Sequence, residues 1–150
     1  MESLLNPSDN QKIINRISSI TPESKAQWAK MNAAQMLAHC QPPLLVAFDE
    51  LKLKLGMMAA LFGGYFRKKM TQDEKPFTQN LPTDAHFVVS NPEEPEKEKE
   101  KLIVLVQRFV KAGPEGLTKE THPFFGKMTG REWDIIQWKH LDHHLRQFGV

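Results

Sequence analysis

The chain has 150 residues, of which 40% are hydrophobic, and this length suits one domain over residues 1–150 with a buried core. The formal net charge is only +2 and the basic residues are scattered, so the composition argues against a nucleic-acid partner. The single cysteine, Cys40, excludes an intramolecular disulfide.

Neither a secretory signal nor a membrane span is recognisable in the sequence. No apolar signal region follows Met1, and with only one cysteine the chain is expected in the reducing cytoplasm. The longest apolar stretch, residues 51–66, is interrupted by lysines and glycines and is shorter than the roughly 20 residues that a span needs. We therefore expect a soluble protein without a membrane partner.

The first half of the chain shows helical patterns separated by prolines. Ser8 is placed to cap a helix over residues 9–20, in which four isoleucines recur at core spacing, and Pro22 is placed to start a short helical turn up to Trp28. Asn32 and Gln35 have the spacing of a capping box, which predicts a second helix that carries His39.

Two prolines interrupt this second helix. Pro42 and Pro43 each remove a backbone donor, so we expect a kink or a break just after His39. From residue 44 to about residue 70 the pattern is again helical and apolar, and it ends in the basic run 67–69, which suits a helix C-terminus.

In the second half we expect a long loop and two helices. Residues 71–90 read as the loop, with an extended piece at 85–89. A helix follows the acidic start at 91–94 and stops near Gly113, and its charges at 93–101 are interpreted as a solvated face. Thr129 and Glu132 form a second capping box ahead of a last helix over 130–148. The sequence thus predicts an all-α helical bundle of four or five helices.

The last helix carries the pattern that bears most directly on function. His140 and His144 are four residues apart, and helical projection puts both on the inward face, with His143 at its edge and Lys139 pointing away. Such a pair either binds a metal ion or consists of core histidines bonded to carbonyls or waters. Leu141 occupies the position of the glutamate base in the HExxH motif, so a zinc-protease mechanism is not encoded.

A metal site needs a further ligand from elsewhere in the chain. The candidates are His39, Cys40, His86 and His122, or a carboxylate. Periodicity does not select His39, which lies on the flank of its helix's apolar face. A lone cysteine such as Cys40 is more often a small buried hydrophobe than a ligand.

Several blocks of the sequence resemble the DinB/YfiT-like superfamily, in particular one of its uncharacterised branches. The blocks are residues 28–40 (WAKMNAAQMLAHC), Pro82-Thr83, 122–126 (HPFFG), Trp133 and 139–149 (KHLDHHLRQFG). The resemblance implies a four-helix bundle with up-down-down-up order. It also implies a divalent metal held by His39, His140 and His144, and a possible homodimer.

The resemblance also suggests a class of activity. Three imidazoles suit Zn²⁺ or Ni²⁺ and leave a coordination position open. Relatives of this kind use a low-molecular-weight thiol, so we expect a thiol-dependent transferase or a hydrolase that acts on a small molecule. The alternative is a non-catalytic bundle dimer with a structural metal or none. His122 is a candidate general acid/base or substrate-orienting residue, or simply packs its loop.

Overall fold

The computed structural model describes residues 2–54, 56–73, 75–81, 87–118 and 121–150, and these residues are mainly helical. In chain order the elements are α1 (Pro7–Ser18), α2 (Ala33–His39), α3 (Gln41–Ala47), α4 (Met57–Thr71), α5 (Pro95–Ala112), the short 3-10 turn η2 (Pro114–Gly116), β1 (Thr121–His122), β2 (Gly126–Lys127) and α6 (Gly130–Gln147). The all-α prediction is confirmed. The antiparallel hairpin of β1 and β2 was not predicted, because two-residue strands are too short to show alternation.

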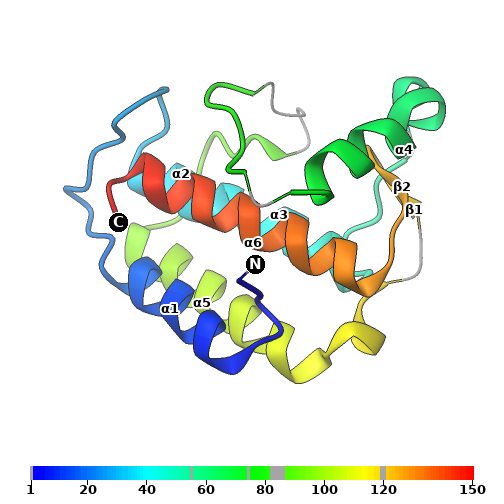
Figure 1. The fold of residues 1–150 in the computed structure, drawn as a ribbon. Helices are drawn as coiled ribbons and strands as arrows, with labels where there is room; N and C mark the ends of the chain where they lie inside the picture. Colours follow the sequence, from blue (N-terminus) through cyan, green and yellow to red (C-terminus); the bar gives the residue numbers. More distant parts are fainter. Residues whose placement is uncertain (1, 55, 74, 82–86, 119–120) are drawn as a thin grey trace.

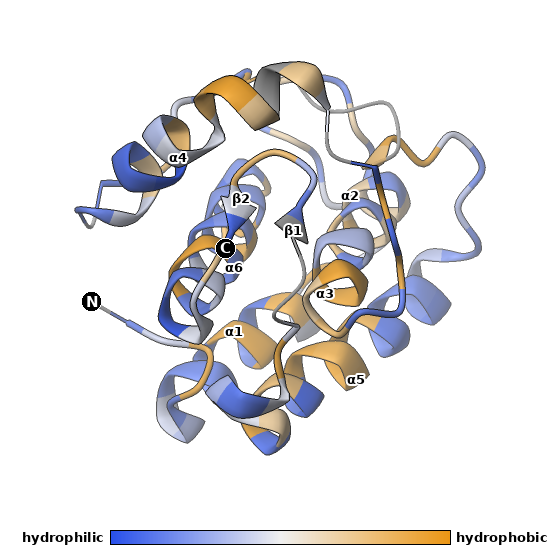
Figure 2. Cartoon of the chain, turned by 90° about the vertical axis from the view of Figure 1, so that its right-hand side faces the viewer, coloured by the Kyte–Doolittle hydropathy of each residue, from blue (hydrophilic) through white to orange (hydrophobic). Residues whose placement is uncertain are grey.

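The helices are arranged around α5 and α6 (Figure 1). Helix α5 packs against α1, α2 and α3, whereas α6 contacts α1, α3 and α4. Hydrophobic parts of α1, α3 and α5 gather at the centre of this group in Figure 2, and α4 lies to one side of it. Among the described helices none has the length and apolarity required to cross a membrane.

The core is built from the predicted apolar faces. The isoleucines of α1 and the apolar positions of α5 and α6 turn inward, as their spacing of three and four residues requires. The largest fully buried side chains are Trp133, Phe109, Leu4, Ile13, Ile17, Ile20, Met36, Leu37, Leu44, Leu102, Leu141 and Leu145.

Both predicted capping boxes are present, but the start of the chain differs from expectation. The side chains of Asn32 and Thr129 each accept from the backbone N–H three residues later, at the first turns of α2 and α6. Helix α1 is capped by Asn6 rather than Ser8, and it begins at Pro7. Residues 21–32 form turns and bends instead of the predicted helical turn.

The proline pair breaks the helix, as predicted. Helix α2 ends at His39, and α3 starts at Gln41 with both prolines in its first turn. Backbone N–H groups in the first turn of a helix have no intrahelical acceptor, so proline costs no hydrogen bond there. Cys40 is the junction between the two helices. His39 therefore occupies the last turn of a short helix, directly before the junction.

The charged segment at the start of α5 is solvated with one exception. Lys97 pairs with Glu93 at 3.5 Å across exposed surface, and Lys99, whose side chain is partly buried, pairs with the exposed Glu96 at 2.9 Å. Glu98, however, is buried, and its carboxylate accepts from the side chain of Gln41 at 2.6 Å. This bond ties α5 to the start of α3.

Helix α4 is anchored to the hairpin and to α6. A Cβ at Gly63 would lie 2.8 Å from the carbonyl oxygen of Phe124, so glycine permits the close approach of helix and hairpin. Lys139 was predicted to point to solvent, and this is wrong. Its side chain is buried, and its Nζ donates to the carbonyl oxygens of Met70 and Asp73 at the end of α4.

The predicted extended piece at 85–89 is only partly described. Residues 85 and 86 lie outside the described residues, and residues 87–89 form no strand. Phe87 is buried against the rest of the chain, and its carbonyl oxygen reaches His39.

Candidate metal centre

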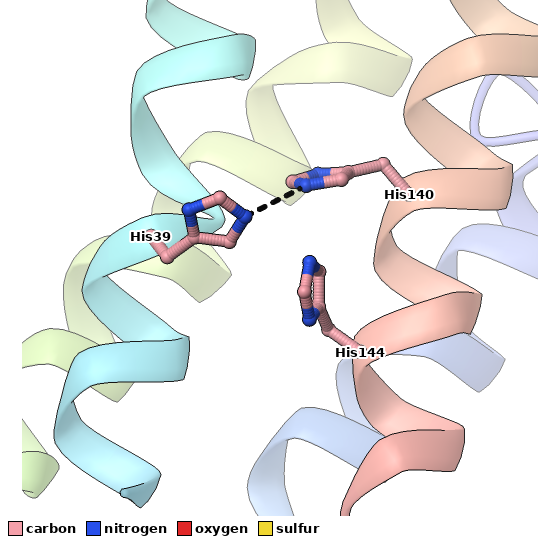
Figure 3. A group of neighbouring side chains, drawn as sticks. All are labelled: His39, His140 and His144. Atoms are coloured by element: carbon pink, nitrogen blue, oxygen red, sulfur yellow. Dashed lines mark hydrogen bonds between the residues drawn. The ribbon is translucent and has the colours of Figure 1, made fainter. Parts of the chain in front are cut away.

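Three histidines converge between α2 and α6 (Figure 3). His39 comes from the end of α2, and His140 and His144 come from successive turns of α6. One ring nitrogen of each lies within 4.8 Å of the other two, and the Nε2 atoms of His39 and His140 are 3.1 Å apart. The structure thus brings together the three residues that the sequence analysis had proposed.

The spacing of the nitrogens is compatible with a shared metal ion. Two imidazole nitrogens, each about 2.1 Å from a tetrahedral centre, are roughly 3.4 Å from each other. The 3.1 Å between the Nε2 atoms of His39 and His140 is close to this value, and the ring nitrogen of His144 lies within 4.8 Å of both. These three buried or partly buried histidines could bind a metal ion.

Hydrogen bonds orient two of the three rings. The Nδ1–H of His39 donates to the carbonyl oxygen of Phe87 at 2.8 Å, and that of His144 donates to Oε1 of Gln147 at 2.9 Å. Gln147 is itself oriented, because its Nε2 donates to the carbonyl oxygen of Trp28 at 2.8 Å. Both histidines therefore keep a lone pair on Nε2, the tautomer that a metal ligand needs.

His140 differs from the other two histidines. Its Nδ1 is buried and has no hydrogen-bond partner among the described residues. Only its Nε2 is engaged, with that of His39. His140 thus lacks the outer partner that a metal-ligating histidine usually has.

The surroundings keep the three histidines neutral. Burial lowers the pKa of His39, and burial lowers the pKa of His144 to about 3, with a smaller contribution from His39. For His140, burial and then the neighbouring histidines hold the pKa well below its usual value. Neutral imidazoles offer lone pairs to a cation at physiological pH without first releasing a proton.

The other candidate ligands do not join this cluster in the described residues. Cys40 is buried, its Sγ faces the Sδ of Met36 at 3.9 Å, and burial raises its thiol pKa, as expected for a structural cysteine. His143 is not part of the cluster, although its ring contacts that of His144 as well as those of Trp28 and Phe77. His86 lies outside the described residues.

The three histidines form part of the wall of a cavity of about 400 Å³. His122 lines the same cavity, from the hairpin before α6. Its Nδ1 accepts from the backbone N–H groups of Phe124 and Phe125, at 3.0 and 3.2 Å, so its hydrogen must be on Nε2. Burial lowers its pKa to about 4. A neutral ring in this tautomer can donate a hydrogen bond, but it has no free lone pair with which to act as a base.

Two groups that orient the site were not found in the sequence analysis, Gln147 and the carbonyl of Phe87. A signal existed for Gln147 alone, because it lies three residues after His144 and so shares its helix face. The carbonyl of Phe87 comes from an irregular segment, where no sequence pattern could indicate it.

Replacing Gln147 by methionine is expected to weaken metal binding by about 10- to 100-fold, the usual cost of losing an outer hydrogen-bond partner. The change keeps the side-chain length but removes the acceptor for His144 and the donor for Trp28. Competition with a chelator of known affinity would measure the loss.

A matched control is available on the same helix. Gln137 is also fully buried, and its Nε2 donates to the carbonyl oxygen of Pro43, but it bonds to none of the three histidines. Gln137→Met should therefore leave the metal affinity within a few-fold of the original. Equal losses in both variants would show that Gln147 acts through general packing only.

Comparison with known proteins gives a family but no activity. Residues 2–149 match the model of a family described as protein of unknown function, DUF1569. The chain belongs to the DUF1569 family. No curated protein and no solved structure matches it. For this DUF1569 chain, function must therefore be inferred from the site itself.

Proposed function

We propose that this chain is a metal-dependent enzyme that acts on a small molecule, with His39, His140 and His144 as the metal ligands. The observation that carries the proposal is the convergence of three neutral imidazoles at the wall of a cavity of about 400 Å³. A ligand set next to a cavity suits catalysis better than a purely structural role, since substrate can approach it.

Zn²⁺ or Ni²⁺ suits this ligand set best. Both are borderline metals that bind imidazole well, and three protein ligands leave room for one more. Bound there, such an ion would lower the pKa of a thiol or of water and so supply a nucleophile at neutral pH. The chain's own part is to hold His39 and His144 in the correct tautomer, through Phe87 and Gln147 respectively.

The resemblance to the DinB/YfiT-like superfamily favours the thiol route. On that basis we propose the up-down-down-up four-helix bundle as the fold type and a thiol-dependent transferase as the activity, with a hydrolase as the other option. The substrate would be a small molecule, the cosubstrate a low-molecular-weight thiol, and the location the cytoplasm. A homodimer is part of the same proposal.

One observation favours the non-catalytic alternative. The Nε2 atoms of His39 and His140 are within hydrogen-bond distance of each other, so these two rings can satisfy one another without any metal. In that case the three histidines would be a polar part of the core, and the chain would be a non-catalytic helical-bundle dimer.

Elemental analysis of protein purified without an affinity tag separates these possibilities. The enzyme proposal expects about one Zn²⁺ or Ni²⁺ per chain. Loaded protein is then assayed for transfer of a thiol such as glutathione to an aromatic electrophile, and for hydrolysis of a simple ester. Absence of stoichiometric metal would refute the proposal, and metal without either activity would favour a structural site.

A further inference from the structure

The wall of the cavity is predominantly apolar and aromatic. Its aromatic members come from the chain segment before α2, from α4, from the segments on either side of residues 82–86, and from the hairpin; they are Trp28, Phe66, Phe77, Phe87, Phe124 and Phe125. Residues far apart in the sequence thus form a single aromatic surface beside the three histidines. Surfaces of this composition bind flat, apolar molecules.

The polar side chains of the wall are neutral groups. Besides the histidines they are Asn80, Gln137 and Gln147, and no lysine, arginine, aspartate or glutamate is among the described residues that line the cavity. A charged ligand would lose part of its hydration there without gaining a partner of opposite charge from these residues. The described part of the wall therefore favours uncharged molecules, except at an atom that approaches a metal.

His122 provides one directional polar contact. The side chain is only 4% exposed, and its Nδ1 is occupied by two backbone N–H groups, so Nε2 carries the hydrogen. Nε2 has no hydrogen-bond partner among the described residues. The rings of Phe125 and Trp133 lie 4.7 and 5.0 Å from that of His122 and fix its position. Nε2 is not among the buried atoms without a partner, and His122 lines the cavity, so this N–H can donate to a molecule bound there.

We propose that the cavity binds an uncharged, mainly aromatic or apolar small molecule with a carbonyl-type oxygen, which accepts a hydrogen bond from Nε2–H of His122. The inference rests on the proposed function in that it names the substrate class of the same site. It makes His122 a substrate-orienting donor rather than a general base. Shape and neutrality select the body of the molecule, and His122 selects the acceptor.

Two probes of nearly equal shape test the hydrogen bond. Acetophenone carries a carbonyl oxygen, and α-methylstyrene has a CH₂ group in its place. Binding of both to the protein as purified is measured by calorimetry and ligand-observed NMR. Since α-methylstyrene is more hydrophobic, the comparison is made between the unmodified protein and a His122 variant, and not between the two probes directly.

His122→Asn is the informative variant. Asparagine can accept from the N–H groups two and three residues later, as Asn6 does with Ser8 and Asp9 in this chain, so the loop keeps its cap. The Nε2 donor is lost. Acetophenone should bind about 2- to 10-fold more weakly to the variant, the range that corresponds to one net hydrogen bond, and α-methylstyrene should change clearly less.

Charge selectivity is tested with benzamidinium, a flat cation of similar size. It is compared with acetophenone after chelation, so that the charge of a bound ion does not repel it, and it should bind at least about tenfold more weakly. The inference is overturned if acetophenone does not bind at millimolar concentration, if His122→Asn weakens both uncharged probes equally, or if benzamidinium binds as well as acetophenone.

Metal content is measured on the same samples, so the two proposals fail separately. Acetophenone binding with the expected selectivity in protein that holds no metal would support the assigned ligand class and refute the proposed enzyme. Metal binding without acetophenone binding would support the proposed metal site and refute the assigned ligand class.

Discussion

His140→Ala and His144→Ala, each alone, are expected to remove most of the bound metal, and His39→Ala should do the same. Each change leaves two imidazoles where three converge within 4.8 Å. The loss in affinity should exceed about 100-fold, because losing only an outer partner already costs up to that factor. Elemental analysis of tag-free protein and chelator competition give the values.

His143→Ala is the matched control for these variants. It removes the same side chain from the same helix, one residue before His144. The ring of His143 contacts those of His144, Trp28 and Phe77, but His143 is not one of the three histidines that could share a metal ion. Its metal content should remain that of the unmodified protein, and circular dichroism should show all four variants to be helical. Full metal content in any of the three ligand variants would contradict the assigned site.

Trp133→Ala is expected to lower the free energy of unfolding by about 3 to 5 kcal/mol, the range for removing a buried aromatic side chain. Trp133 is 0% exposed at the start of α6. Its Nε1 donates to the carbonyl oxygen of Thr118 at 3.2 Å, and its ring packs against His122. The variant should therefore also disturb the hairpin side of the cavity.

Urea denaturation of the metal-free proteins would measure this loss, with Trp133→Phe as the control. Phenylalanine keeps most of the ring and loses the hydrogen bond to Thr118, so the expected cost is smaller, about 1 to 2 kcal/mol. A loss below about 1 kcal/mol for Trp133→Ala would mean that the surrounding core refills the space, and that Trp133 does not support the cavity wall.

The sequence alone determined the features that depend on near neighbours. The capping boxes at Asn32 and Thr129, the break at Pro42, and the shared face of His140 and His144 all follow from contacts within three or four residues. Such contacts are set by helix geometry, so spacing reveals them. The cap of α1 was wrong by two residues, since both Asn6 and Ser8 can serve as caps and the sequence does not choose between them.

Only the tertiary structure decided which of the candidate residues lie together. Residue spacing could not choose His39 over Cys40 or His122, whereas the structure places His39 of α2 next to His140 and His144 of α6. The burial of Lys139 was also decided by tertiary packing. The end of α4 and the residues after it bring the carbonyl oxygens of Met70 and Asp73 to a side of α6 that helical projection assigns to solvent. A helical pattern gives the direction of a side chain from its own axis; what that side chain meets depends on where distant segments pack.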